Sequence, residues 1–213
     1  MNLFYRACIL LITLTMMVGC ATNRGVIEIQ DVPVANPSQG VGLKFSRISD
    51  NRAFELKPAQ ASTPSLKNGE IEDTEITSRA IARKRNGYGM ALGDILLPEG
   101  RTVAEVVQNR LTKGFQENGY RVLTPGDANY DSAIPLDVDI NKFWGWMSPG
   151  FLSIGLNFQT AIDVTAPLKG LENSIEVDSE VQKRFQTAAG RNWKTVIDLS
   201  LDELSADILK ELN

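Results

Sequence analysis

The chain of 213 residues contains no histidine and only two cysteines, Cys8 and Cys20. The absence of histidine excludes Ser-His-Asp and Cys-His catalysis, histidine-ligated metals and a histidine-based pH switch. The formal net charge is −4, so the chain as a whole lacks the positive excess with which proteins coat nucleic acid. We therefore predict no nucleic-acid partner, no cofactor, no metal and no enzyme activity.

The chain also lacks an N-terminal apolar run long enough to cross a membrane. Residues 7–18 (ACILLITLTMMV) form a run of twelve residues, whereas a membrane-spanning helix takes about 20 apolar residues. A short segment with one positive charge, Arg6, precedes this run, as in a secretory signal. The alternative interpretation is an N-terminal membrane anchor that is retained.

The motif that follows this run points to lipid attachment. Met17-Val18-Gly19-Cys20-Ala21 resembles the lipobox of bacterial lipoproteins, in which the Cys thiol receives a diacylglyceryl group. We predict a signal peptide at 1–19, lipidation at Cys20 and a lipidated tether at 20–40. Cys8 would leave with the signal, so no intramolecular disulfide and no free thiol would remain. Ala21 in place of Asp resembles the enterobacterial sorting signal for the outer membrane, with the domain facing the periplasm.

Residues 41–213 are predicted to form a single domain. Alternating apolar and polar residues predict strands at 41–48, 134–141, 152–164 and 175–182, and a shorter one at 120–123. Thr102 and Glu105 form a capping box at the start of a helix at 102–118, and a second amphipathic helix follows at 192–212. The predicted fold is α+β, in the order β-α-β-β-β-β-α. It has an antiparallel sheet of four to five strands, with two helices packed on one face.

A long loop insertion is predicted at about 58–98. It opens with the turn-rich PAQASTPSLKNG, runs acidic and then basic, and contains a short helix near 74–85. A loop of this length inside a compact domain is uncommon and often functional.

Taken together, these motifs resemble a known family. The lipobox is followed by a strand ending in Asp50-Asn51-Arg52, a V-x-x-V-V-x-x-x-L helix and Asn118-Gly119-Tyr120. This combination resembles the YajG-like lipoproteins of Gram-negative bacteria, whose function is poorly defined. The resemblance implies no catalytic residues, and this chain departs from it at about 55–98. A weaker likeness is to auxiliary lipoproteins of envelope transporters.

A cluster of large apolar residues is the first candidate site. Phe143, Trp144, Trp146, Met147 and Phe151 lie between two predicted strands, where a hairpin normally carries polar residues. Exposed rings here would mark a contact with a membrane or a protein partner. The alternative is that these side chains fold back onto the helices as core.

Charged residues supply the other candidates. Arg79, Arg83, Lys84 and Arg85 precede the Gly-rich NGYGMALGD and could bind an anion, such as an anionic lipid, lipopolysaccharide phosphate or an anionic polymer, or else form a solvated basic face. Asp50 and Arg52 could anchor a ligand or stabilise a turn. Asp137 and Asp139 share one face of a strand and are typical of the wet side of a sheet, although paired carboxylates can do acid–base chemistry.

These observations favour a non-catalytic lipoprotein of the outer membrane that binds or assembles an envelope complex. The alternative is a carrier or sensor of an envelope amphiphile, such as a lipid or lipopolysaccharide, or an auxiliary subunit of an envelope transporter.

Overall fold

The computed structural model describes residues 24–31 and 33–212, so the signal-peptide and Cys20 predictions lie outside the described residues. The described strands are β1 (Gly25–Val26), β2 (Gly42–Asp50), β3 (Ala80–Arg85), β4 (Ala91–Leu96), β5 (Arg121–Val122), β6 (Ile134–Pro149), β7 (Ile154–Thr165) and β8 (Ile175–Phe185). The described helices are the 3-10 helix η1 (Lys67–Glu72), α2 (Thr74–Thr77), α3 (Val103–Glu117) and α4 (Gly190–Glu211).

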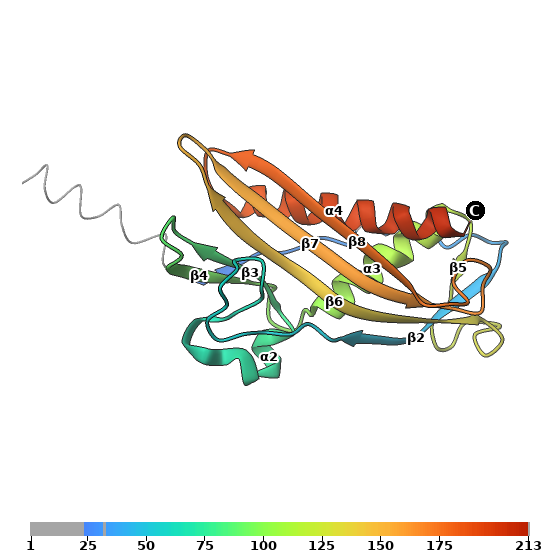
Figure 1. Cartoon of the computed structure of the whole chain (residues 1–213). Coiled ribbons are helices and arrows are strands. Elements are labelled where there is room, and N and C mark those ends of the chain that lie inside the picture. Colours follow the sequence, from blue (N-terminus) through green and yellow to red (C-terminus); the bar gives the residue numbers. More distant parts are fainter. Residues whose placement is uncertain (1–23, 32, 213) are drawn as a thin grey trace, which may run out of the picture.

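The 16-residue strand β6 organises the sheet (Figure 1). One edge of β6 pairs antiparallel with β7 along almost its whole length, and β7 pairs antiparallel with β8. The other edge is shared by two strands. β2 pairs in parallel with the first half of β6, and β3 pairs in parallel with Gly145 and Trp146 further along. The sheet therefore forks, with β5 beyond β2 and with β4 and β1 beyond β3.

Two long helices cover one face of the sheet (Figure 1). α3 begins at the predicted capping box, with Glu105 donating its backbone N–H to Thr102 and accepting from the Thr102 N–H. α3 packs over β2 and β5, and α4 packs over β7 and β8. The core between helices and sheet is closely filled, with Phe143 and Phe158 in edge-to-face contact at 4.8 Å. Trp193 of α4 is buried in the same core.

The predicted antiparallel sheet of four to five strands is wrong. The structure has a mixed sheet of eight described strands, and its β1–β4, β2–β5, β2–β6 and β3–β6 pairings are all parallel. The solvent-exposed polar face of the strands suggested antiparallel pairing. Two strands can nevertheless pair in parallel if a crossover connection joins them. The chain between β2 and β6 is such a crossover, because it carries β3, β4 and α3.

Two segments expected to be irregular are built into the domain. The predicted loop insertion at 58–98 contains η1, α2, β3 and β4, and its predicted helix is confined to Thr74–Thr77. The described part of the predicted tether is docked: Ile27 and Ile29 are buried in the core, and Asn36 exchanges hydrogen bonds with the backbone of Val122. Short strands with few alternating residues explain why both segments resemble loops in the sequence.

Candidate binding surface

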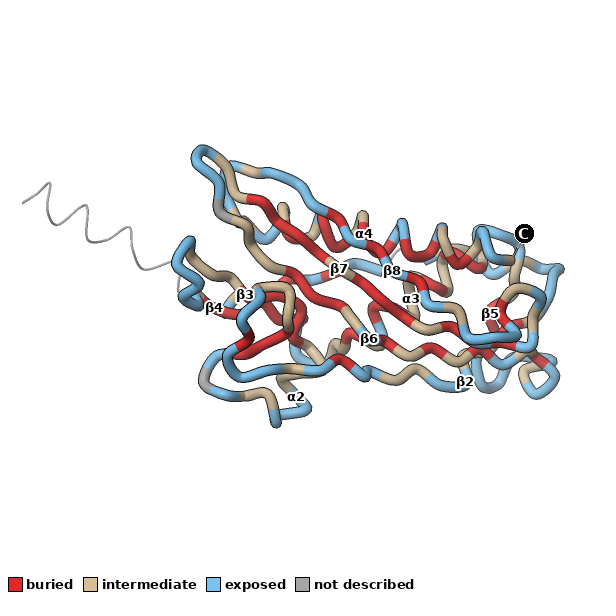
Figure 2. Tube along the Cα trace, viewed as in Figure 1, coloured by how far each residue is buried: buried red, intermediate tan, exposed pale blue. Residues whose placement is uncertain are grey.

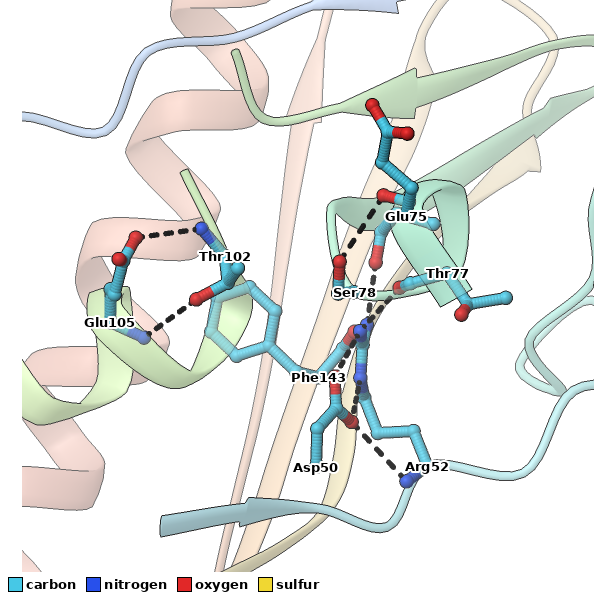
Figure 3. Close-up of polar contacts among 9 residues, drawn as sticks. Asp50, Arg52, Glu75, Thr77, Ser78, Thr102, Glu105 and Phe143 are labelled. Atoms are coloured by element: carbon cyan, nitrogen blue, oxygen red, sulfur yellow. Dashed lines mark hydrogen bonds and ion pairs between the residues drawn. The ribbon is translucent and has the colours of Figure 1, made fainter. Parts of the chain in front are cut away.

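Arg52 is buried at the fork in the sheet, where it pairs with the more exposed Asp50 to form a junction (Figure 3). The Arg52 guanidinium bonds both carboxylate oxygens of Asp50, at 2.7 Å each. It also donates to the carbonyls of Ala80, Phe143 and Thr77, at 2.5, 3.2 and 2.7 Å. These carbonyls lie where the edge of β6 passes from β2 to β3. The pair therefore links β2, α2, β3 and β6. The guanidinium nitrogens of Arg52 all donate within the protein, so they are not available to bind a ligand.

The segment 51–79, here called the flap, lies beside this junction. It covers the second face of the sheet, which is the face opposite α3 and α4. Trp144 is fully buried under it, in a small core with Leu66, Ala80 and Leu96. The Trp144 indole Nε1 donates to the Ala61 carbonyl at 3.3 Å, and Phe54 packs edge-on against the indole. This end of the sheet is therefore covered on both faces.

The structure places most of the aromatic cluster inside the fold, which favours the core alternative over the predicted partner contact. Phe143 and Trp144 are each 0% exposed, and Trp146 and Met147 are partly buried. A β-bulge between Ile140 and Lys142 shifts the alternation, so Phe143 and Met147 face the helices while Trp144 and Trp146 face the flap. Of the five, Phe151 alone is fully exposed, at 98%.

The predicted anion site at Arg79, Arg83, Lys84 and Arg85 is not assembled either. The strand β3 sends Lys84 to the face opposite Arg83 and Arg85. The Arg79 guanidinium donates to the Leu97 carbonyl, and Arg85 donates to the Ser65 hydroxyl at 2.9 Å. Burial lowers the pKa of the Lys84 ammonium and of the Arg85 guanidinium, whose pKa the nearby Arg83 charge lowers further.

Sequence reasoning missed the buried carboxylate that pairs with Arg83. Asp94 of β4 is fully buried and lies opposite Arg83 in the strand pairing, with the Arg83 Nε 3.6 Å from the Asp94 carboxylate. Arg24 donates to Asp94 at 3.1 Å, and it also bonds Glu70 of η1. In the sequence, Asp94 is a single acid within the apolar, strand-like run 91–97. This isolation was the signal that could have predicted a buried carboxylate.

Asp137 and Asp139 lie on the exposed second face of the sheet, opposite Arg47 of β2. Arg47 donates to both carboxylate oxygens of Asp139 and lies 3.8 Å from Asp137. The hydrogen bond from Arg47 is the main cause that lowers the pKa of the Asp139 carboxyl. A carboxylate held ionised in this way is not poised to act as a general acid near neutral pH.

Beyond the flap, the face of β6, β7 and β8 that lies opposite the helices carries several acids. Its register places Asp139, Asp163 and Glu176 in one row across the three strands, and Lys142, Ala161 and Asp178 in the next. Glu180 follows in the row of Gln159. We call the set Asp139, Asp163, Glu176, Asp178 and Glu180 the acidic face. Figure 2 shows exposed and buried residues alternating along β8.

The described residues hold no group of three or more His, Cys, Asp or Glu side chains placed to bind a metal ion. Within the same part of the chain, no helix has the length and apolar character needed to cross a bilayer. The helix–sheet interface, where an amphiphile carrier would hold its ligand, is filled by side chains that are 0–1% exposed, including Phe158, Trp193, Ile197 and Leu201.

Comparison with known proteins finds solved structures with partial similarity but no relative by sequence. No family model and no characterised protein matches the chain. An uncharacterised protein of known structure shares 11% identity, with a TM-score of 0.49 over 90% of this chain and 99% of its own. A DUF330 protein from Xanthomonas campestris shares 9%, with a TM-score of 0.48 over 89% of this chain and 94% of its own.

A minor lipoprotein from Acinetobacter baumannii is also similar, with 14% identity and a TM-score of 0.36 over 52% of this chain and 85% of its own. At these identities the likeness concerns the arrangement of elements alone, and the resemblance to the YajG-like family stays a prediction.

Proposed function

We propose that the protein is a lipoprotein, held in the outer membrane through Cys20, that acts as a non-catalytic binding or assembly factor for an envelope complex. The observation that carries the binding role is the acidic face, which neither the helices nor the flap covers. Lys142 is the basic residue within its rows, and Arg47 reaches Asp139 from the neighbouring row, against five carboxylates. The resemblance of Met17–Ala21 to a lipobox carries the anchoring role.

The charge of this face defines the chemistry of its partner. Glu176, Asp178 and Glu180 are exposed at alternate positions of β8 and point to the same side. A concentration of one sign of charge raises the association rate of a partner of opposite sign and disfavours partners of like sign. The expected partner is a protein surface rich in Lys and Arg.

A photo-crosslinking amino acid at Glu180, introduced into the protein in living cells, tests this role. We expect a discrete protein adduct that weakens when Glu176→Gln and Asp178→Asn remove neighbouring charges. Ala206 is exposed on α4, on the opposite side of the sheet, and the crosslinker placed there is the matched control. Equal adducts at both positions, or none at Glu180, would contradict the proposed surface.

A further inference from the structure

Two hairpin turns carry large apolar side chains into solvent. In the β3–β4 turn Tyr88 is 94% exposed and Met90 is 64% exposed. In the β6–β7 turn Phe151 is 98% exposed and Leu152 is 77% exposed. We call these four residues the apolar tips. Both turns are exposed in Figure 2.

The β3–β4 turn is fixed by its own hydrogen bonds. The Asn86 side-chain oxygen accepts from the backbone N–H groups of Tyr88 and Met90, at 3.0 and 2.9 Å. Gly89 adopts a φ of +78°, which suits glycine. Tyr88 and Met90 are thus presented outward by a closed turn rather than by an irregular loop.

Both turns lie at the same end of the molecule, far from the C-terminal end of α4 (Figure 1). The described chain also begins at this end. β1 pairs in parallel with the last residues of β4, Gly25 opposite Ile95 and Val26 opposite Leu96. Because β4 runs away from the Tyr88 turn, the chain enters β1 from the side of that turn.

The length of chain between this entry point and the predicted anchor is short. Arg24 is fixed by its bonds to Asp94 and Glu70. Four peptide steps separate Arg24 from Cys20, and at full extension they span about 14 Å. A lipid on Cys20 would therefore hold this end of the domain close to the membrane surface.

Charge is partitioned along the same axis. Cut at matched rows of the strand register, the tip end comprises residues 84–93, 145–158 and 181–197, which are the two hairpin ends, the end of β8 and the start of α4. They contain 6 Lys and Arg residues and no Asp or Glu. All 26 acidic residues, and 16 of the 22 basic ones, belong to the remainder of the chain. Lys183, Arg184 and Arg191 are exposed behind the tips, with Arg184 near Ser153 of the β6–β7 turn.

We propose that the apolar tips insert into the phospholipid surface in which Cys20 is anchored, with Lys183, Arg184 and Arg191 at the level of the headgroups. This inference rests on the proposed lipid anchor. Burial of aromatic and aliphatic side chains at the boundary of the acyl chains contributes favourable free energy to membrane binding. Basic side chains contribute favourable electrostatic energy when they lie near anionic headgroups. One anchor and two inserted turns would fix the domain's orientation and present its acidic face to the side.

The test uses the lipidated full chain with single cysteines, Tyr88→Cys, Phe151→Cys and Lys183→Cys, each labelled with an environment-sensitive fluorophore. Lys169→Cys is the matched control, because Lys169 is exposed in the turn between β7 and β8, at the opposite end of β7 from the tips. Each variant is reconstituted into vesicles of phosphatidylethanolamine and phosphatidylglycerol that contain spin-labelled lipids.

We expect the probes at positions 88 and 151 to lose most of their emission to quenchers on the acyl chains. The probe at 183 should lose its emission only to headgroup quenchers, and the probe at 169 to neither. Mass spectrometry of the N-terminal peptide reports acylation of Cys20 independently. An acylated protein whose probes at 88 and 151 stay unquenched overturns tip insertion alone. An unacylated N-terminus in the membrane-isolated protein overturns the proposed anchor, and this inference with it.

Discussion

Removal of the Arg52 side chain should reveal how much of the domain's stability depends on the fork in the sheet. Its guanidinium bonds the Asp50 carboxylate and the carbonyls of Ala80, Phe143 and Thr77. Arg52→Ala would leave three backbone acceptors and one carboxylate without this donor, and would remove one of the links between the flap and β6.

The expected loss in the free energy of unfolding follows from how deeply Asp50 and Arg52 are buried. Breaking a buried ion pair by removing one partner costs about 3–5 kcal/mol. The Arg52 side chain is 0% exposed but that of Asp50 is 23% exposed, so water recovers part of the lost solvation and we expect about 3 kcal/mol. Arg52→Lys keeps the charge but has fewer donors and no planar fork, and should lose about 2 kcal/mol.

Urea unfolding of the Cys20→Ser protein, followed by tryptophan fluorescence and circular dichroism, measures these differences. The matched control is Arg47→Ala, because Arg47 also pairs with an aspartate across strands but its side chain is 48% exposed. That change should cost only about 0–1 kcal/mol. If Arg52→Ala and Arg47→Ala destabilise the domain equally, the junction does not hold the fork together and the reasoning fails.

Three other predictions follow from the same packing. Trp144→Ala should cost about 3–5 kcal/mol in urea unfolding, because it empties the core under the flap. Flap cleavage in limited proteolysis should accelerate in parallel. Gly145→Ala should destabilise by about 1–3 kcal/mol, because a Cβ there would lie 2.7 Å from the Trp193 ring. Asp139 has a lowered pKa in the folded state, so its ion pair with Arg47 should stabilise the fold above the ordinary carboxyl range. The difference in stability between wild type and Asp139→Asn should then disappear as the pH falls through the folded pKa.

Each of these predictions has an outcome that contradicts it. A Trp144→Ala protein as stable as a Phe151→Ala protein would show that the flap does not depend on the buried indole. An unchanged melting temperature for Gly145→Ala would mean that α4 can shift without loss. A difference between wild type and Asp139→Asn that persists unchanged into strong acid would exclude the Arg47 pair as its origin.

Several local features of this protein are determined by its sequence. The capping box at Thr102 and Glu105 defines the start of α3, because each side chain satisfies an orphan N–H of the other's backbone. The alternation at 134–140 identifies the buried face of β6, because successive side chains of a strand point to opposite faces. The lipobox resemblance at Cys20 likewise depends only on neighbouring residues.

The tertiary structure alone decided how these elements meet. The bulge before Lys142 moved Trp144 from the helix side to the flap side, and no pattern in the aromatic run shows where the register shifts. Arg83 lies opposite Asp94 across a strand pair. Arg52 donates hydrogen bonds to three carbonyls from other elements. The carbonyls around Arg52 come together through the parallel pairing of β3 with β6, whereas Arg83 and Asp94 meet across the antiparallel β3–β4 hairpin. Periodicity reports the face on which a side chain lies, but the fold decides what covers that face.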